Sequence, residues 1–148
     1  MTDTEARRDA PQPITHLRRR LRPASRPVGR DRGMGYAYGV QAGNLVFVSG
    51  QLATDASGAL VGEGDVEAQA MKAFENVEAV IAEAGGTRAD IVKVTVYLPQ
   101  SSYLDAMQRA RRRFFTDPDY PASTAIFGPL VRPEYLVEID AIAVLDAS

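Results

Sequence analysis

The last strand-like stretch of the chain, from Tyr135 to Val144, is almost entirely apolar and yet contains two carboxylates. Successive side chains of a β-strand point to opposite faces, so Glu138 and Asp140 share one face, while Ile139 and Ala141 lie on the other. A carboxylate in so apolar a strand indicates either an exposed sheet edge or a working pocket. Both interpretations remain open at this point.

A second apolar run precedes this stretch and covers residues 120–127. The two runs are rich in β-branched residues and are separated by Gly128, Pro129 and Pro133, which are typical of a loop. We therefore predict that the chain ends in a hairpin of two strands.

An earlier hairpin is predicted by the turn sequence Ala42-Gly43-Asn44 between apolar runs at 36–41 and 45–51. Ser49 and Gly50 lie near the end of the second run. A glycine there permits the close approach of a ligand or of another backbone, or else marks a bulge or strand exit.

Two helices are predicted between the hairpins. Apolar residues recur at helical spacing between Asp65, a suitable N-cap, and the glycines at 85–86, and again over residues 101–115, where arginines form the outer side. A strand at 91–98 separates them. The order β-β-α-β-α-β-β predicts an α+β domain of two layers, with two helices over one sheet.

Composition limits the chemistry. The chain has 148 residues, a formal net charge of −2, no cysteine and a single histidine, His16. This composition excludes disulfides, a thiol nucleophile and a metal site made of cysteine or several histidines. We therefore expect no metal. The overall charge implies neither a nucleic-acid nor a membrane partner, and no apolar run approaches the roughly 20 residues of a spanning helix. We expect a soluble, cytoplasmic protein.

Residues 1–33 differ from the domain at 34–148, since they are rich in proline and arginine and poor in apolar residues. This composition predicts an extended or mobile arm outside the folding unit. Contact with RNA or an acidic partner and packing on a neighbouring subunit are alternatives, and residues 16–21 have the composition of a short helical turn.

Several motifs, in order, resemble the reactive intermediate deaminase family, also called RidA or YjgF. They are Ala-Gly-Asn-Leu-Val-Phe-Val-Ser-Gly-Gln at 42–51, Phe-Glu-Asn-Val-Glu-Ala-Val at 74–80, Asp90 to Leu98, Tyr-Pro-Ala-Ser at 120–123 and Leu136 to Ala143. The likeness covers the chain from about Tyr36 to Val144 and leaves the arm outside.

The resemblance implies a chorismate-mutase-like α+β fold and a homotrimer whose sheets form a central barrel, with ligands bound in clefts between subunits. Typical members of the family hydrolyse reactive enamines and imines to 2-keto acids and ammonia without a metal or an organic cofactor. Other members have been described as ribonucleases or translation inhibitors.

The resemblance also implies site residues, position by position. Tyr36 falls on the family's pocket tyrosine, and Ser49 and Gly50 match its Ser-Gly lining. Glu138 falls on the glutamate thought to orient or activate water. Gln108 stands where a pocket asparagine is common.

The chain departs from the family at Ser123. The family has Pro-Ala-Arg there, and its arginine grips the substrate carboxylate, whereas this chain has Pro121-Ala122-Ser123. A hydrogen bond to a charged group contributes roughly 1.5–3 kcal/mol, so the loss of this arginine weakens binding of a 2-imino acid by about one to two orders of magnitude. Arg132, in the loop before the last strand, is either a replacement anchor or a surface arginine.

The sequence therefore favours a divergent hydrolase or deaminase of the RidA type. Its substrate would be a small metabolite with an imine, enamine or related C–N bond, other than a simple 2-imino acid. A trimer that binds small molecules without catalysis is the first alternative. An RNA-directed protein that uses the arginine-rich arm is the second, and the single pair of candidate acids makes ribonuclease chemistry a weak interpretation.

Overall fold

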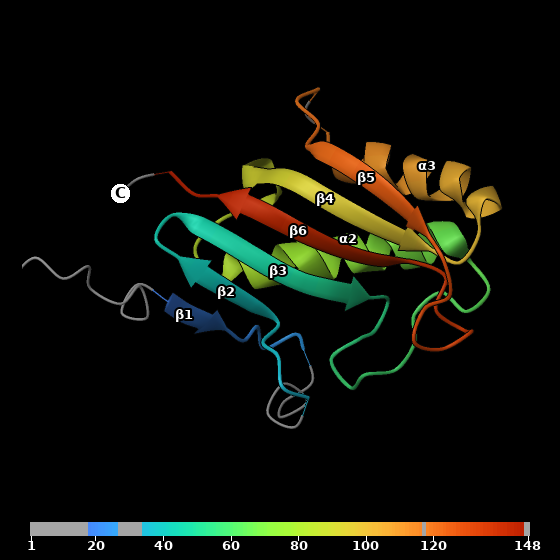
Figure 1. The fold of residues 1–148 in the computed structure, drawn as a ribbon, viewed down its shortest axis with the longest axis horizontal. Coiled ribbons are helices and arrows are strands. Elements are labelled where there is room, and N and C mark those ends of the chain that lie inside the picture. Colours follow the sequence, from blue (N-terminus) through green and yellow to red (C-terminus); the bar gives the residue numbers. More distant parts are fainter. Residues whose placement is uncertain (1–17, 27–33, 117, 147–148) are drawn as a thin grey trace, which may run out of the picture.

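The computed structural model describes residues 18–26, 34–116 and 118–146. Over these ranges a six-stranded sheet carries two α-helices on one face (Figure 1). The strands are β1 (Arg18–Leu21), β2 (Gly39–Ala42), β3 (Leu45–Leu52), β4 (Ile91–Leu98), β5 (Ala122–Phe127) and β6 (Glu138–Val144). The helices are α2 (Val66–Ala82) and α3 (Leu104–Phe114), with short 3-10 turns η2 (Arg88–Asp90) and η3 (Ser101–Tyr103). The predicted two-layer α+β fold is confirmed.

The sheet order is β1-β2-β3-β6-β4-β5, with β4 and β5 parallel and the other neighbours antiparallel. The predicted C-terminal hairpin is therefore wrong, because β6 lies between β3 and β4 and does not pair with β5. Ile139, Ala141 and Ala143 on β6 are buried, whereas every residue of β5 is exposed. The strand with the buried face takes the centre of the sheet, and β5 is left at its edge.

A side-chain cap begins α2, and the two helices pack against each other through aromatic residues. The Asp65 side chain accepts a hydrogen bond from the Ala68 backbone at 3.0 Å and begins α2 as predicted. On α3 the buried side chains include Met107, Ala110 and Phe114. The rings of Phe74 and Phe114 stack with their centroids 5.0 Å apart, which joins the two helices over the sheet.

The N-terminal arm differs from the prediction where the structure describes it. Residues Arg18–Leu21 form a strand rather than a helical turn, and β1 pairs with β2 through Leu21 and Gly39. Leu21 is 0% exposed and Arg26 only 6%. A few well-placed side chains thus join this segment to the domain although its average composition is polar. His16 and the rest of residues 1–17 and 27–33 lie outside the described residues.

Replacement of Leu21 tests whether β1 belongs to the folding unit. A β-carbon at Gly39 would lie 3.4 Å from Leu21 Cδ1, so the leucine packs directly over β2. We expect Leu21→Ala to lower the free energy of unfolding by about 2–5 kcal/mol, the usual loss for a buried leucine. Urea denaturation measures it, with exposed Arg18→Ala as the control that changes stability little. Equal midpoints for the two variants would show that the arm is dispensable.

Candidate functional site

A cavity of about 530 Å³ opens where β3 ends and β6 begins. Its walls come from the N-terminal segment, from β3 and the residues after it, from the loop before β6, and from β6 itself. The lining residues are Arg26, Met34, Tyr36, Tyr38, Ser49, Gly50, Leu52, Thr54, Val131, Arg132, Tyr135 and Glu138.

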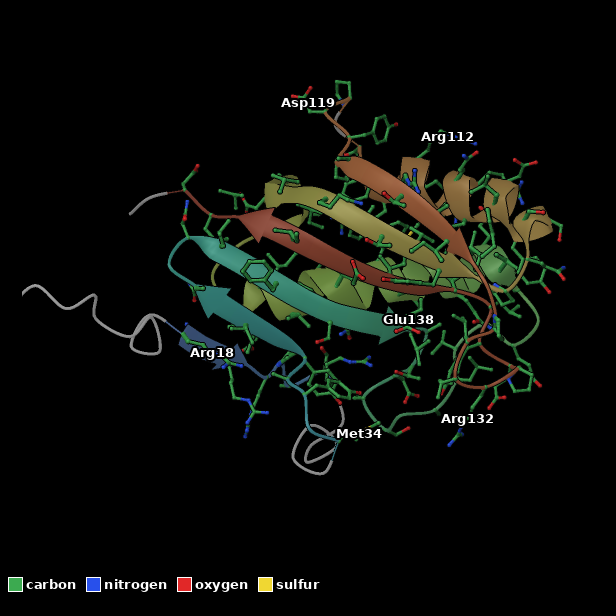
Figure 2. The ribbon with its side chains drawn as sticks, in the orientation of Figure 1. Arg18, Met34, Arg112, Asp119, Arg132 and Glu138 are labelled. Atoms are coloured by element: carbon green, nitrogen blue, oxygen red, sulfur yellow. The ribbon has the colours of Figure 1, made fainter. Side chains whose placement is uncertain are left out.

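Five residues that the sequence singled out therefore line the same cavity: Tyr36, Ser49, Gly50, Arg132 and Glu138. They come from two parts of the chain, residues 36–50 and 132–138, that are far apart in the sequence, and the pairing of β3 with β6 brings them together. Figure 2 shows Glu138 at the beginning of β6 beside β3, with Arg132 on the loop below it.

Ser49 and Gly50 form a β-bulge. The register between β3 and β6 shifts between Val48, which pairs with Ala141, and Gln51, which pairs with Ile139, so two residues of β3 face one of β6. The Ser49 hydroxyl donates a hydrogen bond to the Ala37 carbonyl at 2.6 Å, and its backbone N–H donates to the Tyr38 carbonyl at 2.9 Å. The bulge is thus fixed to the segment that carries Tyr36.

Gly50 provides the space that the Glu138 carboxyl occupies. A β-carbon on residue 50 would overlap the carboxyl, with the Glu138 Cδ atom only 2.9 Å away. Of the interpretations offered by the sequence, the bulge is confirmed. The group that approaches Gly50 is the Glu138 side chain and not the ligand or backbone that was predicted.

The electrostatic environment of Glu138 differs from that of Asp140, which lies two residues along β6. Burial, and secondly the negative charge of Asp140, raises the pKa of Glu138. Asp140 instead accepts a hydrogen bond from the Tyr97 hydroxyl at 2.8 Å, and this bond is the main cause of a raised Tyr97 pKa. The structure therefore separates a carboxyl with a hydrogen-bonded partner from one that faces the cavity.

Glu138 lies on β6, which has a neighbouring strand on each side, so the interpretation that this carboxylate marks a sheet edge is wrong. Within the described residues, the shift of its pKa has no contribution from a hydrogen bond. Such a carboxyl can exchange protons with a bound molecule at a pH closer to neutrality than an ordinary glutamate can.

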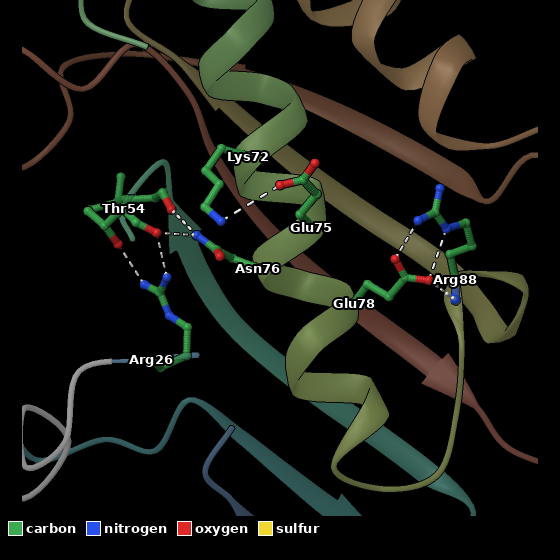
Figure 3. Close-up of polar contacts among 8 residues, drawn as sticks. Arg26, Thr54, Lys72, Glu75, Asn76, Glu78 and Arg88 are labelled. Atoms are coloured by element: carbon green, nitrogen blue, oxygen red, sulfur yellow. Dashed lines mark hydrogen bonds and ion pairs between the residues drawn. The ribbon is translucent and has the colours of Figure 1, made fainter. Parts of the chain in front are cut away.

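Arg26 was missed by the sequence reasoning. Its guanidinium donates to the Thr54 carbonyl at 2.9 Å and to the Thr54 hydroxyl at 2.8 Å, and lies 5.5 Å from the centroid of the Tyr38 ring. Asn76 of α2 donates to the same Thr54 carbonyl at 2.9 Å, so the contact is supported from the helix layer (Figure 3). Among the many arginines of the arm, no sequence pattern marked this one.

Gln108 and Ser123 are not among the residues that line this cavity. Gln108 lies on α3, and Ser123 is exposed on the edge strand β5, where it pairs with Val94 of β4. Within one subunit the structure therefore does not bring these two positions to the carboxylate.

A second cavity, of about 500 Å³, lies at the other end of the sheet, between the turn that joins β2 and β3 and the C-terminal end of α2. It includes the carboxylates Asp90 and Asp146 but none of the candidate site residues that the sequence analysis named. Asp90 already accepts a hydrogen bond from the Thr87 backbone at 2.7 Å. Among the residues that the structure describes, no group of three His, Cys, Asp or Glu side chains is placed to hold a metal ion.

Neither described helix has the length and apolar composition that crossing a membrane requires.

Comparison with known proteins gives consistent matches. The family described as Endoribonuclease L-PSP matches residues 31–145. A RutC family protein of Pyrococcus abyssi is 32% identical over 120 residues, which cover 81% of this chain and 90% of that protein. A protein of Salmonella typhimurium named 2-iminobutanoate/2-iminopropanoate deaminase is 35% identical over 111 residues, which cover 74% of this chain and 86% of the relative.

Solved structures are similar over nearly their whole length. RidA from an Antarctic Psychrobacter gives a TM-score of 0.76 at 29% identity and covers 86% of this chain and 98% of its own. A protein of unknown function from Pseudomonas aeruginosa gives 0.76 at 35% identity, with 88% and 94% covered. From the matched residues, the shared fold and these relatives, the chain belongs to the Endoribonuclease L-PSP family, which includes the RutC and RidA proteins.

Proposed function

We propose that the protein hydrolyses an imine, an enamine or a related C–N bond of a small metabolite, with Glu138 as the residue that moves protons. The observation that carries the proposal is the Glu138 carboxyl, which lines a cavity and has a raised pKa. The relative from Salmonella, whose name describes an imine deaminase, supports this reaction class.

The reaction can be written with residues that line the cavity. The Glu138 carboxylate takes a proton from a water molecule as the water oxygen bonds to the carbon of the protonated imine, and the electrons of the C=N bond move to nitrogen, which gives a neutral carbinolamine. Glu138 then returns its proton to the nitrogen of the resulting carbinolamine. The C–N bond breaks as the hydroxyl proton passes to the Glu138 carboxylate and the carbonyl forms, so the products are a ketone or keto acid and ammonia, which takes the proton from Glu138 as it leaves. Backbone N–H groups near the cleft polarise the electrophile.

We further propose that simple 2-imino acids are poor substrates. Ser123 offers one neutral hydroxyl where the sequence resemblance predicts an arginine, and a serine cannot form the paired, charge-assisted contact of a guanidinium with a carboxylate.

The protein would act as a cytoplasmic homotrimer. Leu45, Phe47 and Val144 are exposed on the sheet face that the helices leave uncovered, and β5 is exposed along its whole length (Figure 1). A neighbouring copy that covers these surfaces would bring Gln108 and Ser123 toward a second subunit's cavity. Their distance from the cavity of their own subunit is consistent with this arrangement.

A binding protein without catalysis would use the same cavity and the same trimer. The effect of Glu138→Gln on turnover distinguishes such a binding protein from the hydrolase. An RNA-directed function would depend on the exposed arginines of β1, such as Arg18 and Arg20. It would weaken steeply with added salt.

Replacement of Glu138 by glutamine tests its proton transfer. The amide is similar in shape but cannot accept a proton, so we expect Glu138→Gln to lower kcat by about 10²-fold or more, the usual range for a general base. Ammonia release from imines generated in the assay measures the rate. An unchanged rate would give Glu138 a structural role and favour the binding protein.

The pH dependence of the stability of the same variant tests the environment of Glu138. A raised pKa means that the folded state prefers the protonated Glu138, so the wild type loses stability as the pH rises from the ordinary value of 4.5 through the folded value. Glu138→Gln has no such loss. Its melting temperature relative to the wild type should therefore increase from pH 4 to pH 7, and a decrease would contradict the buried, cavity-facing carboxyl.

Restoration of the family arginine tests the substrate proposal. Ser123 is exposed, so Ser123→Arg should fold normally. We expect it to raise kcat/KM for 2-iminobutanoate at least tenfold, which corresponds to about 1.4 kcal/mol of transition-state binding. If the wild-type enzyme already hydrolyses this imine as fast as the variant, Ser123 does not limit the reaction.

Light scattering tests the assembly. We expect a mass of about three times the 16.0 kDa chain at micromolar concentration. Phe47 is 44% exposed on the open sheet face, so Phe47→Asp should place a charge inside the interface and shift the mass toward the monomer. A monomeric wild type would contradict the trimer.

A further inference from the structure

Tyr97 of β4 lies beside the two carboxyls of β6. In the antiparallel register of these strands, Tyr97 is the partner of Glu138, and Thr95 is the partner of Asp140. Partners in such a ladder lie about 4.5–5.5 Å apart and point to the same face of the sheet. Tyr97, Glu138 and Asp140 are therefore grouped on the face that the helices leave uncovered, where each is half-buried.

The Tyr97 hydroxyl donates its hydrogen bond diagonally across the two strands. Its direct partner in the ladder is Glu138, yet it donates to Oδ2 of Asp140 at 2.8 Å. A phenol has one proton to donate, so this bond is not shared with Glu138. The result is one carboxyl that is held in place on the sheet and a neighbouring carboxyl that receives no hydrogen bond from Tyr97.

Asp140 places a negative charge close to Glu138. An aspartate is ordinarily ionised at neutral pH, and residues two apart in a strand share a face. A like charge disfavours the ionisation of a neighbouring carboxyl. In agreement with this geometry, the pKa of Glu138 is raised first by burial and second by the charge of Asp140.

The charged groups that face Glu138 from the loop and the N-terminal segment have contacts of their own. On the loop before β6, the Arg132 side chain is 63% exposed, and its Nη1 atom lies 3.8 Å from Glu134, so water screens this pair. In the N-terminal segment, the Arg26 guanidinium donates to both oxygen atoms of Thr54. The other titratable side chains that line the cavity are phenols, which ordinarily carry no charge at neutral pH: Tyr36, Tyr38 and Tyr135.

The strands on either side of β6 leave Asp140 as the neighbouring charge. From β3, a serine and a glycine reach the cavity beside Glu138. On β4, the Lys93 ammonium donates to the Thr124 hydroxyl of β5 at 3.0 Å, so it is directed away from β6. Among the described residues of the sheet, Asp140 is thus the charged side chain that adjoins Glu138.

We propose that Asp140 is a positioning residue for the hydrolysis: its charge, held in place by Tyr97, makes Glu138 a stronger base, although Asp140 itself does not line the cavity. A general base transfers protons best when its proton affinity suits the working pH. Two carboxyls on one strand can thus take different roles that their surroundings decide. The catalytic use of this effect rests on the proposed function, whereas the effect on Glu138 does not.

Removal of the Asp140 charge tests the effect on Glu138. Asp140→Asn keeps an oxygen that accepts the Tyr97 hydrogen bond, so the variant changes the charge and little else. An NMR titration of the side-chain carboxyl carbons of the full-length protein measures the pKa of Glu138, whose signal is identified by its loss in Glu138→Gln. We expect this pKa to be lower in Asp140→Asn than in the wild type. Asp105→Asn, which removes an exposed carboxylate from the first turn of α3, should leave it unchanged.

The pH profile of kcat/KM tests the catalytic use. Glu138 must be ionised to take a proton from water, so the acid limb of the profile follows its pKa. In Asp140→Asn we expect this limb to move to lower pH and the rate at its upper plateau to fall, because the base is weaker. A residue that merely supported the fold would lower the rate by the same factor at every pH.

Two results would overturn the inference. The first is a pKa of Glu138 that is the same in Asp140→Asn as in Asp105→Asn, and the second is a rate lowered equally at every pH. If Asp140→Asn does not fold, Asp140→Thr also removes the charge and places a β-branched residue in the strand. A lower Glu138 pKa in a protein whose wild type releases no ammonia from imines would reject the hydrolase alone. Ammonia release by the wild type with an unchanged Glu138 pKa in the variant would reject the role of Asp140 alone.

Discussion

The pairing of β3 with β6 is the constraint on which the site depends, because it places a carboxylate in a central strand. Removal of Glu138 from water is unfavourable, and the neighbouring strand is shaped to accept it. The bulge at Ser49 and Gly50 interrupts the ladder, and Gly50 leaves room for the carboxyl. The apolar side chains on the other face of β6, such as Ile139, are fully buried and hold the strand in place. One face of the strand is therefore packed in the core, and Glu138 on the other face lines the cavity.

The sequence predicted those features that depend on local periodicity. Alternation placed Glu138 and Asp140 on one face, and Asp65 marked the beginning of α2, since side-chain direction and helix capping are set within a few residues. The order of the strands is set by the whole sheet. No local sequence signal shows that β6 lies between β3 and β4. The prediction that the two last strands pair as a hairpin was therefore wrong, although both strands exist.

The N-terminal arm shows a second limit of prediction from the sequence. Average composition predicted a segment outside the fold, but β1 is held by single residues such as Leu21, whose burial an average does not reveal. Arg26 was hidden for the same reason, among arginines that look alike in the sequence. The family resemblance drew attention to Ser123 and Gln108, which do not line this cavity, because correspondence between residues does not show where the fold places each side chain.

The two halves of the site are built on regions of the fold that differ in how freely they can change. Glu138 is fixed by strand pairing, and a residue change at Gly50 or in the β3–β6 ladder would move it. Arg132 lies on an exposed loop at the edge of the cavity, where substitutions disturb little of the core, whereas Arg26 is buried and hydrogen-bonded to Thr54. A substitution in this loop can therefore alter the wall of the cavity while the carboxylate stays in place. On the edge strand β5, Ser123 likewise lies outside the β3–β6 ladder that holds Glu138.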